Sequence, residues 1–116
     1  MKTASEEGVL CNFSEGPCAR SELTLGLTPV HAPSEQSLAL TLTSPDGWQV
    51  RGARIEGRDM FMGVIPVRFD TQGRATVMYG SCSSDYMVWR LWVTLENAEG
   101  EERIRFFDWR ADGSPQ

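Results

Sequence analysis

The stretch that decides the fold is Ser37-Leu38-Ala39-Leu40-Thr41-Leu42-Thr43, followed at once by Ser44-Pro45-Asp46-Gly47. Leucine recurs at every second position, and side chains along a β-strand alternate between its two faces. The Pro-Asp-Gly cluster that follows is typical of a turn. The stretch therefore predicts one β-strand with a single apolar face against a core, closed by a turn.

The same pattern extends in both directions along the chain. Before this stretch, Leu23, Leu25 and Leu27 alternate with polar or small residues, and after it come further apolar or alternating runs over residues 50–55, 60–69, 75–79, 87–95 and 104–109. No window shows the apolar period of a helix. About seven short strands, separated by turns roughly every ten residues, predict an all-β fold, an immunoglobulin-like antiparallel β-sandwich.

Length and composition indicate one soluble domain. The chain has 116 residues, 41% of them hydrophobic and 23% charged, which suffices for one core but not for two. We expect a single sandwich over residues 9–110, after a flexible lead or targeting remnant at residues 1–8 and before a flexible tail at residues 111–116. No stretch approaches the roughly 20 apolar residues that span a bilayer. The net charge of −5 makes nucleic acid a poor partner.

Three cysteines bear on the compartment. Cys11 and Cys18 flank a short, turn-rich segment, which is easier to explain by a disulfide than by two reduced thiols. That pairing leaves Cys82 as a free thiol, which outside the cytoplasm would point to metal ligation or redox chemistry. Two alternatives stay open, because Cys82 could equally be a buried, inert side chain or could bond Cys11 or Cys18.

A methionine pair is the first candidate for ligand chemistry. Strand parity over residues 60–69 places Met60 and Met62 on the face opposite the apolar one. Side chains at positions i and i+2 lie about 7 Å apart, and flexible thioethers at that spacing could share an ion, for which soft sulfur selects Cu(I). The alternative is that both methionines cover the edge of the core. Pro66 predicts an edge strand or a bulge, and a bulge would reverse the parity beyond it.

The loop that carries Cys82 is the second candidate, and it leads directly into the next strand. In that strand the odd positions from Met87 to Leu95 are all apolar and are expected to face the core. Met87 is therefore expected to pack, although its place at the end of the loop keeps it as a weaker ligand candidate. His31, the only histidine, lies between Pro29 and Pro33 and is expected to be a solvated loop residue without a role.

Catalytic signatures are missing from the sequence. It contains one histidine, no glycine-rich phosphate loop and no Cys-x-x-Cys pair, so the usual hydrolase, nucleotide-binding and zinc patterns do not apply. We therefore expect a protein that is not an enzyme.

Three motifs together resemble a known group of proteins: Gly57-x-Asp59-Met60-x-Met62-Gly63, Gly80-x-Cys82-Ser83 and Met87-x-Trp89. They are similar to those of small bacterial proteins whose genes often accompany Sco/SenC copper chaperones and cytochrome oxidase assembly factors. Members of that group carry a membrane anchor or signal and a β-sandwich similar to FixH and YtkA-like domains. The resemblance covers roughly residues 11–107 and implies a periplasmic location, with Met60, Met62 and Cys82 as Cu(I) ligands.

The sequence thus favours an extracytoplasmic Cu(I)-handling accessory protein, tethered to the membrane or free in the periplasm. Its partner would be an oxidase assembly factor or a copper chaperone. A first alternative is a metal-free interaction module, in which the methionines and Trp92 form an outward patch for a protein partner. A second alternative is a thiol redox protein that uses Cys82 with another cysteine.

Overall fold

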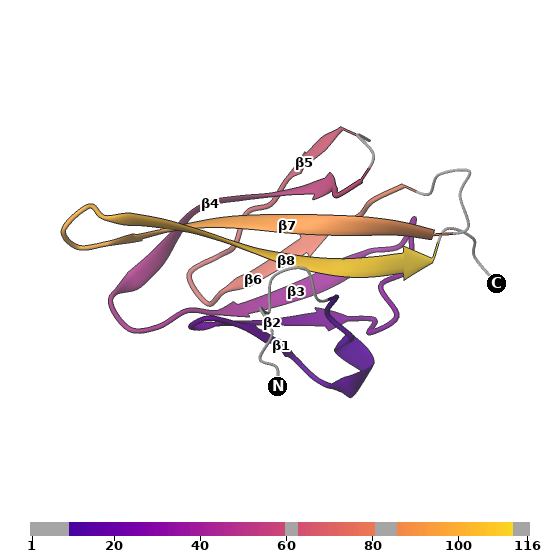
Figure 1. Cartoon of the computed structure of the whole chain (residues 1–116), viewed down its shortest axis with the longest axis horizontal. Coiled ribbons are helices and arrows are strands. Elements are labelled where there is room, and N and C mark those ends of the chain that lie inside the picture. Colours follow the sequence, from indigo (N-terminus) through magenta and orange to yellow (C-terminus); the bar gives the residue numbers. More distant parts are fainter. Residues whose placement is uncertain (1–9, 60–62, 81–85, 113–116) are drawn as a thin grey trace.

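Two antiparallel sheets of four strands form the protein (Figure 1). The computed structural model describes residues 10–59, 63–80 and 86–112. The first sheet has the order β1-β2-β3-β6, with β1 at Cys18–Arg20, β2 at Leu23–Thr28, β3 at Leu38–Thr43 and β6 at Arg74–Val77. The second has the order β5-β4-β7-β8, with β5 at Val64–Pro66, β4 at Trp48–Gly57, β7 at Tyr86–Asn97 and β8 at Glu102–Asp112. The predicted β-sandwich is confirmed.

The core lies between the two sheets and follows the alternation in the sequence. The leucines of β2 and β3 are buried, and so are the odd positions of β7 from Met87 to Leu95. Each fully buried aliphatic side chain contributes about 1.5–3 kcal/mol relative to an exposed one. The apolar alternation therefore accounts for both the strand assignment and the packing of the sheets.

The structure corrects three predictions about the strands. The described residues form eight strands, and the additional one is β1, which was not predicted. Among the described residues 63–69, the strand is limited to Val64–Pro66, and Met60 and Met62 lie outside the described residues. β8 continues through Asp112 and buries Ala111, which was predicted to belong to the tail. The parity predicted for residues 64–70 and the edge position predicted from Pro66 are both confirmed.

A disulfide joins Cys11 to Cys18, as predicted. The bond ties a short segment against β8, where the Cys11 N–H donates to the Asp108 carbonyl over 2.7 Å. Within this segment Phe13 meets the ring of Trp109 edge-on, with centroids 5.6 Å apart. Because the two cysteines bond each other, the alternative in which Cys82 bonds either of them does not describe this structure.

Removing this disulfide is expected to weaken the fold measurably. The variant Cys11→Ala/Cys18→Ala should lower the free energy of unfolding by about 2.5 kcal/mol, since the closed loop is short and restricts the unfolded chain only modestly. Urea titration followed by tryptophan fluorescence measures the change. The wild-type protein unfolded in excess reductant is the control, and it should reproduce the variant's midpoint; an unchanged midpoint in both would contradict the prediction.

A polar network crosses the buried core. The indole N–H of Trp109 donates to the Tyr79 hydroxyl over 3.0 Å, and that hydroxyl donates to the Ala32 carbonyl over 2.9 Å. The ring of Tyr79 also stacks on Trp89, with centroids 4.7 Å apart. The network ties the loop after β2 to both β7 and β8, because Tyr79 bridges the two sheets.

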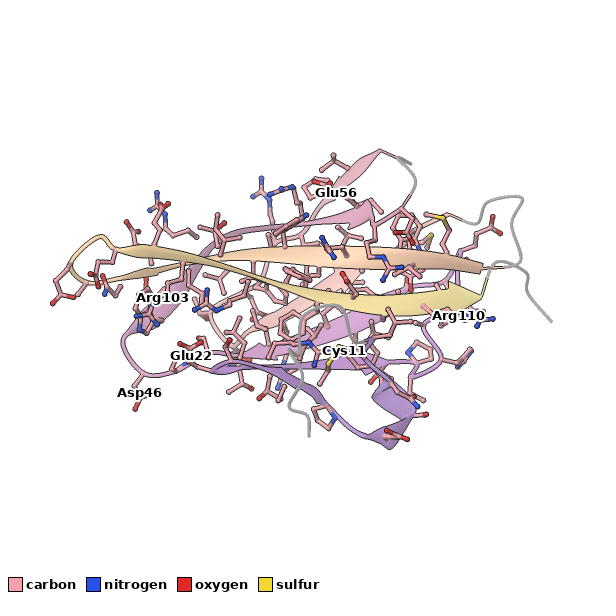
Figure 2. The ribbon with its side chains drawn as sticks, viewed as in Figure 1. Cys11, Glu22, Asp46, Glu56, Arg103 and Arg110 are labelled. Atoms are coloured by element: carbon pink, nitrogen blue, oxygen red, sulfur yellow. A yellow bond between two sulfur atoms is a disulfide. The ribbon has the colours of Figure 1, made fainter. Side chains whose placement is uncertain are left out.

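Strand β8 is an edge strand, and charged side chains protect its unpaired edge against pairing with a further strand. Arg103 and Arg105 occupy positions that would face the core, opposite Leu95 and Val93 of β7. Both reach toward Glu22 in the turn after β1, and the Arg103 guanidinium lies 2.9 Å from its carboxylate (Figure 2). Inward-pointing charges on an edge strand discourage further strand pairing. Edge-to-edge association is therefore disfavoured along this part of β8.

Candidate functional site

The predicted ligand residues fall largely outside the described structure. Met60, Met62 and Cys82 belong to the segments that it does not describe. Met87 is 5% exposed, lies in the hydrophobic core and pairs with Ala111 across the sheet. Its position agrees with the expectation that Met87 packs in the core.

The strand register places the end of β4 beside the start of β7, and each of these strand ends adjoins one of the candidate loops. Gly57 at the end of β4 pairs with Trp89 near the start of β7, and the N–H of Arg58 donates to the Val88 carbonyl over 2.9 Å. The chain therefore leaves β4 beside the point at which it enters β7. Within residues 10–59, 63–80 and 86–112, no three His, Cys, Asp or Glu side chains are grouped to hold a metal.

The described residues place a second candidate site on the outer face of the β5-β4-β7-β8 sheet. Here three rows of side chains cross the strands on the side away from the core. The first row is Pro66, Arg54, Trp92 and Phe106; the second is Val64, Glu56, Arg90 and Asp108; the third is Gly52, Thr94 and Ile104. We refer to these residues as the outer face. Glu56 projects from β4 away from the first sheet in Figure 2.

Cations and aromatic rings alternate within the outer face. The guanidinium carbons of Arg54 and Arg90 both lie 5.3 Å from the ring centroid of Trp92. Arg90 also lies 3.9 Å from the centroid of Phe106, and the two rings are 5.3 Å apart. Each such contact contributes about 0.5–1 kcal/mol at an exposed site, so together they hold four long side chains in one arrangement.

A buried carboxylate anchors this arrangement. Asp108 is 1% exposed and accepts two hydrogen bonds from Arg90, at 2.7 and 2.8 Å. This paired carboxylate raises the pKa of the Arg90 guanidinium above its ordinary value. Arg58 lies 4.0 Å from the same carboxylate and forms two hydrogen bonds with Asp59. The hydrogen bonds of Arg58 lower the pKa of Asp59.

Two exposed aliphatic residues belong to the outer face. Val64 on β5 is 52% exposed and Ile104 on β8 is 58% exposed. Gly52 in the third row carries no side chain, and the space where one would stand is open. The outer face thus combines fixed arginine and aromatic groups with accessible apolar surface, the composition typical of protein interfaces.

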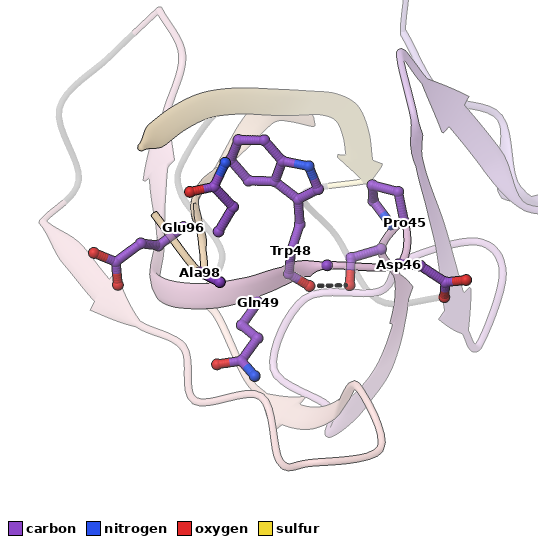
Figure 3. A pocket seen from close by; sticks show the side chains of 9 residues that line it. Pro45, Asp46, Trp48, Gln49, Glu96 and Ala98 are labelled. Carbon is purple, nitrogen blue, oxygen red and sulfur yellow. Dashed lines mark hydrogen bonds between the residues drawn. The ribbon is translucent and has the colours of Figure 1, made fainter. Parts of the chain in front are cut away.

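A shallow cleft lies at the end of the second sheet where Trp48 pairs with Asn97 (Figure 3). It has a volume of about 450 Å³ and is lined by the β3–β4 and β7–β8 turns around Trp48. Its polar groups do not converge, because the carboxylates of Asp46 and Glu96 point to opposite sides. The Asn97 side chain forms hydrogen bonds within its own turn: it accepts from the N–H groups of Glu99 and Glu101 and donates to the Glu101 carboxylate. We assign this cleft no ligand.

Sequence reasoning identified only part of the outer face. The interaction-module alternative had Trp92 pointing outward, and the strand register places it on the outer face. Arg54, Arg90 and Phe106 were not singled out, because their meeting depends on the pairing register of three strands. The signal that could have found two of them was the even-numbered positions of residues 88–94, which place Arg90 and Trp92 on the same face.

No known protein family, curated protein or solved structure matches the chain. The resemblance to proteins that accompany copper chaperones therefore stays a prediction. No helix in the part of the chain that the structure describes is long and apolar enough to cross a membrane.

Proposed function

We propose that this protein is a non-catalytic binding domain that docks a partner protein on its outer face. The observation that carries the proposal is the fixed row of Arg54, Trp92 and Phe106 between two exposed aliphatic residues, Val64 and Ile104. Tryptophan and arginine are the residues most enriched among those that dominate binding energy. Their preformed arrangement lowers the entropy lost on binding, since few side chains must be ordered.

Peptide selection tests the proposal and does not require the partner to be identified first. A phage-displayed peptide library is selected on the wild-type protein, and the enriched peptides are synthesised and measured by isothermal titration calorimetry. We expect binding that Ile104→Lys abolishes and Thr76→Lys preserves, because Thr76 is exposed on the outer side of the other sheet. A library that yields no binder, or binders indifferent to Ile104→Lys, would count against docking at the outer face.

The strand order supports an immunoglobulin-like assignment within this proposal. In immunoglobulin-type sandwiches the third, sixth and seventh strands share one sheet. Here β4, β7 and β8 lie side by side opposite β2, β3 and β6, in the same chain order once β1 is set aside as an added edge strand. The fold itself does not decide the function, which rests on the outer face.

Cu(I) handling is the second candidate, favoured by the position of the end of β4 beside the start of β7, each of which adjoins one of the candidate loops. Gly57 pairs with Trp89. The segment of Met60 and Met62 therefore begins beside the point at which the segment of Cys82 ends. A thioether pair and one thiolate form a soft donor set suited to Cu(I). In this proposal the protein lies outside the cytoplasm, which the disulfide supports, and serves an oxidase assembly factor or a copper chaperone.

A Cu(I) titration against a competing chelator tests the second candidate. Stoichiometric binding is expected for the protein reduced at Cys82, and it should be lost in both Met60→Leu/Met62→Leu and Cys82→Ser. The control is Ile104→Leu, which exchanges one apolar side chain for another at an exposed position of β8, away from both candidate loops. Failure of the wild-type protein to compete would remove Cu(I) handling and also the metal role of Cys82.

A further inference from the structure

The charges of the outer face are exposed unequally, with the cations outermost. In the Arg54–Glu56 pair the side chains are 47% and 28% exposed, and in the Arg90–Asp108 pair they are 24% and 1% exposed. Arg51 and Glu96, which adjoin the face, are 61% and 27% exposed. In the Arg58–Asp59 pair the carboxylate is the more exposed group, since the Arg58 side chain is 28% and the Asp59 side chain is 64% exposed. In three of these pairs solvent therefore reaches the guanidinium group more than its carboxylate partner, on a protein whose net charge is −5.

Arg54 is placed to bind an incoming anion. Glu56 accepts from its Nε atom, and among the described residues neither of its terminal nitrogens has a hydrogen-bond partner. Because the guanidinium lies over Trp92, its donor edge is held in place while its charge is about half exposed. A planar fork of two N–H donors matches a carboxylate in two parallel hydrogen bonds.

From this geometry we infer that the partner surface is acidic: a carboxylate binds Arg54 while neighbouring apolar side chains cover Trp92 and Ile104. The inference rests on the proposed docking at the outer face and specifies the chemistry of the partner. Complementary charge would also guide the partner to this face, since the rest of the protein repels it. Docking is accordingly expected to weaken as ionic strength rises.

Nuclear magnetic resonance titration with two short peptides tests the inference. The probes are a capped five-residue peptide of alternating leucine and glutamate and its counterpart with glutamine in place of glutamate. We expect the acidic peptide to shift the Arg54 Nε–H and Trp92 indole signals and to bind about fivefold more tightly than the glutamine peptide, which corresponds to one modest ion pair. Arg54→Glu should remove this preference.

The matched control is Arg74→Glu, which makes the same charge change on the outer side of the other sheet. It should leave the preference for the acidic peptide in place. Equal binding of the two peptides, no response to the acidic peptide, or equal loss in both variants would overturn the inference. Docking itself is judged separately, by whether the library-selected peptides depend on Ile104.

Discussion

Asp108→Ala is expected to be among the most destabilising single substitutions in this protein, lowering the free energy of unfolding by about 3 kcal/mol. The Asp108 carboxylate is 1% exposed and is the acceptor for both Arg90 hydrogen bonds. Its removal leaves the Arg90 guanidinium partly buried without its counter-charge. Guanidinium chloride would obscure charge effects, so urea denaturation is the appropriate measurement.

Two further variants identify the cause of this loss. Asp59→Ala removes an exposed carboxylate from the same network and should change stability little, because surface ion pairs contribute weakly. Arg90→Met/Asp108→Leu replaces both charges by apolar groups and should recover most of the loss, since a matched apolar pair needs no compensation. If the double variant is as unstable as Asp108→Ala, lost packing and not the unpaired charge is responsible.

Tyr79→Phe is expected to lower the free energy of unfolding by about 2 kcal/mol, although it removes a single oxygen atom. That oxygen accepts from the Trp109 indole and donates to the Ala32 carbonyl, so the change leaves both groups buried without partners. Each unsatisfied buried group costs roughly 1–3 kcal/mol. In a Trp109→Phe background the same change should cost less, since one of those groups is already gone. Equal costs in the two backgrounds would contradict the network.

Because of the same hydroxyl, we expect the free energy of unfolding to fall as the pH rises above 10. Burial raises the pKa of the Tyr79 phenol above its ordinary value of 10.0. Above pH 10 the unfolded chain releases this proton while the folded protein retains it, so the phenol's contribution is complete below pH 10 and declines as the pH rises. Relative to Tyr79→Phe, the wild-type protein should lose about 1 kcal/mol between pH 10 and 11, because the unfolded phenol is half ionised at pH 10 and almost fully ionised at pH 11. Urea midpoints of both proteins at pH 8, 10 and 11 measure the difference.

Strand positions could be predicted wherever apolar residues alternate without interruption. This holds for the leucines of β2 and β3 and for the odd positions of β7. Prediction failed at β1, which has only three residues. The last strand was predicted over residues 104–109, whereas β8 spans Glu102–Asp112, because Arg103 and Arg105 break the alternation at positions of inward parity. Those two arginines are stabilised by Glu22 from a distant turn, and no local pattern reports such a partner.

The candidate site was less predictable than the fold because it depends on pairing across strands. Parity indicated that Trp92 points outward, yet its row with Arg54 and Phe106 requires the register of β4, β7 and β8. The register of β4 shifts between Val50 and Gly52 at a bulge, and one residue of shift moves every side chain to the other face. The sequence alone therefore indicates that a side chain points outward, but it does not indicate which side chains of the adjacent strands lie beside it.

The order of the strands has a consequence for biosynthesis. β4 pairs with β7, and only the three-residue β5 covers its other side, so most of β4 has no partner until the chain beyond Tyr86 has been made. Folds that depend on such distant pairings form in milliseconds to seconds, more slowly than helical bundles. During that interval the unpaired rim of β4 is open to intermolecular pairing. The β7–β8 hairpin, which is synthesised last, ends this vulnerable period and commits the chain to its native state.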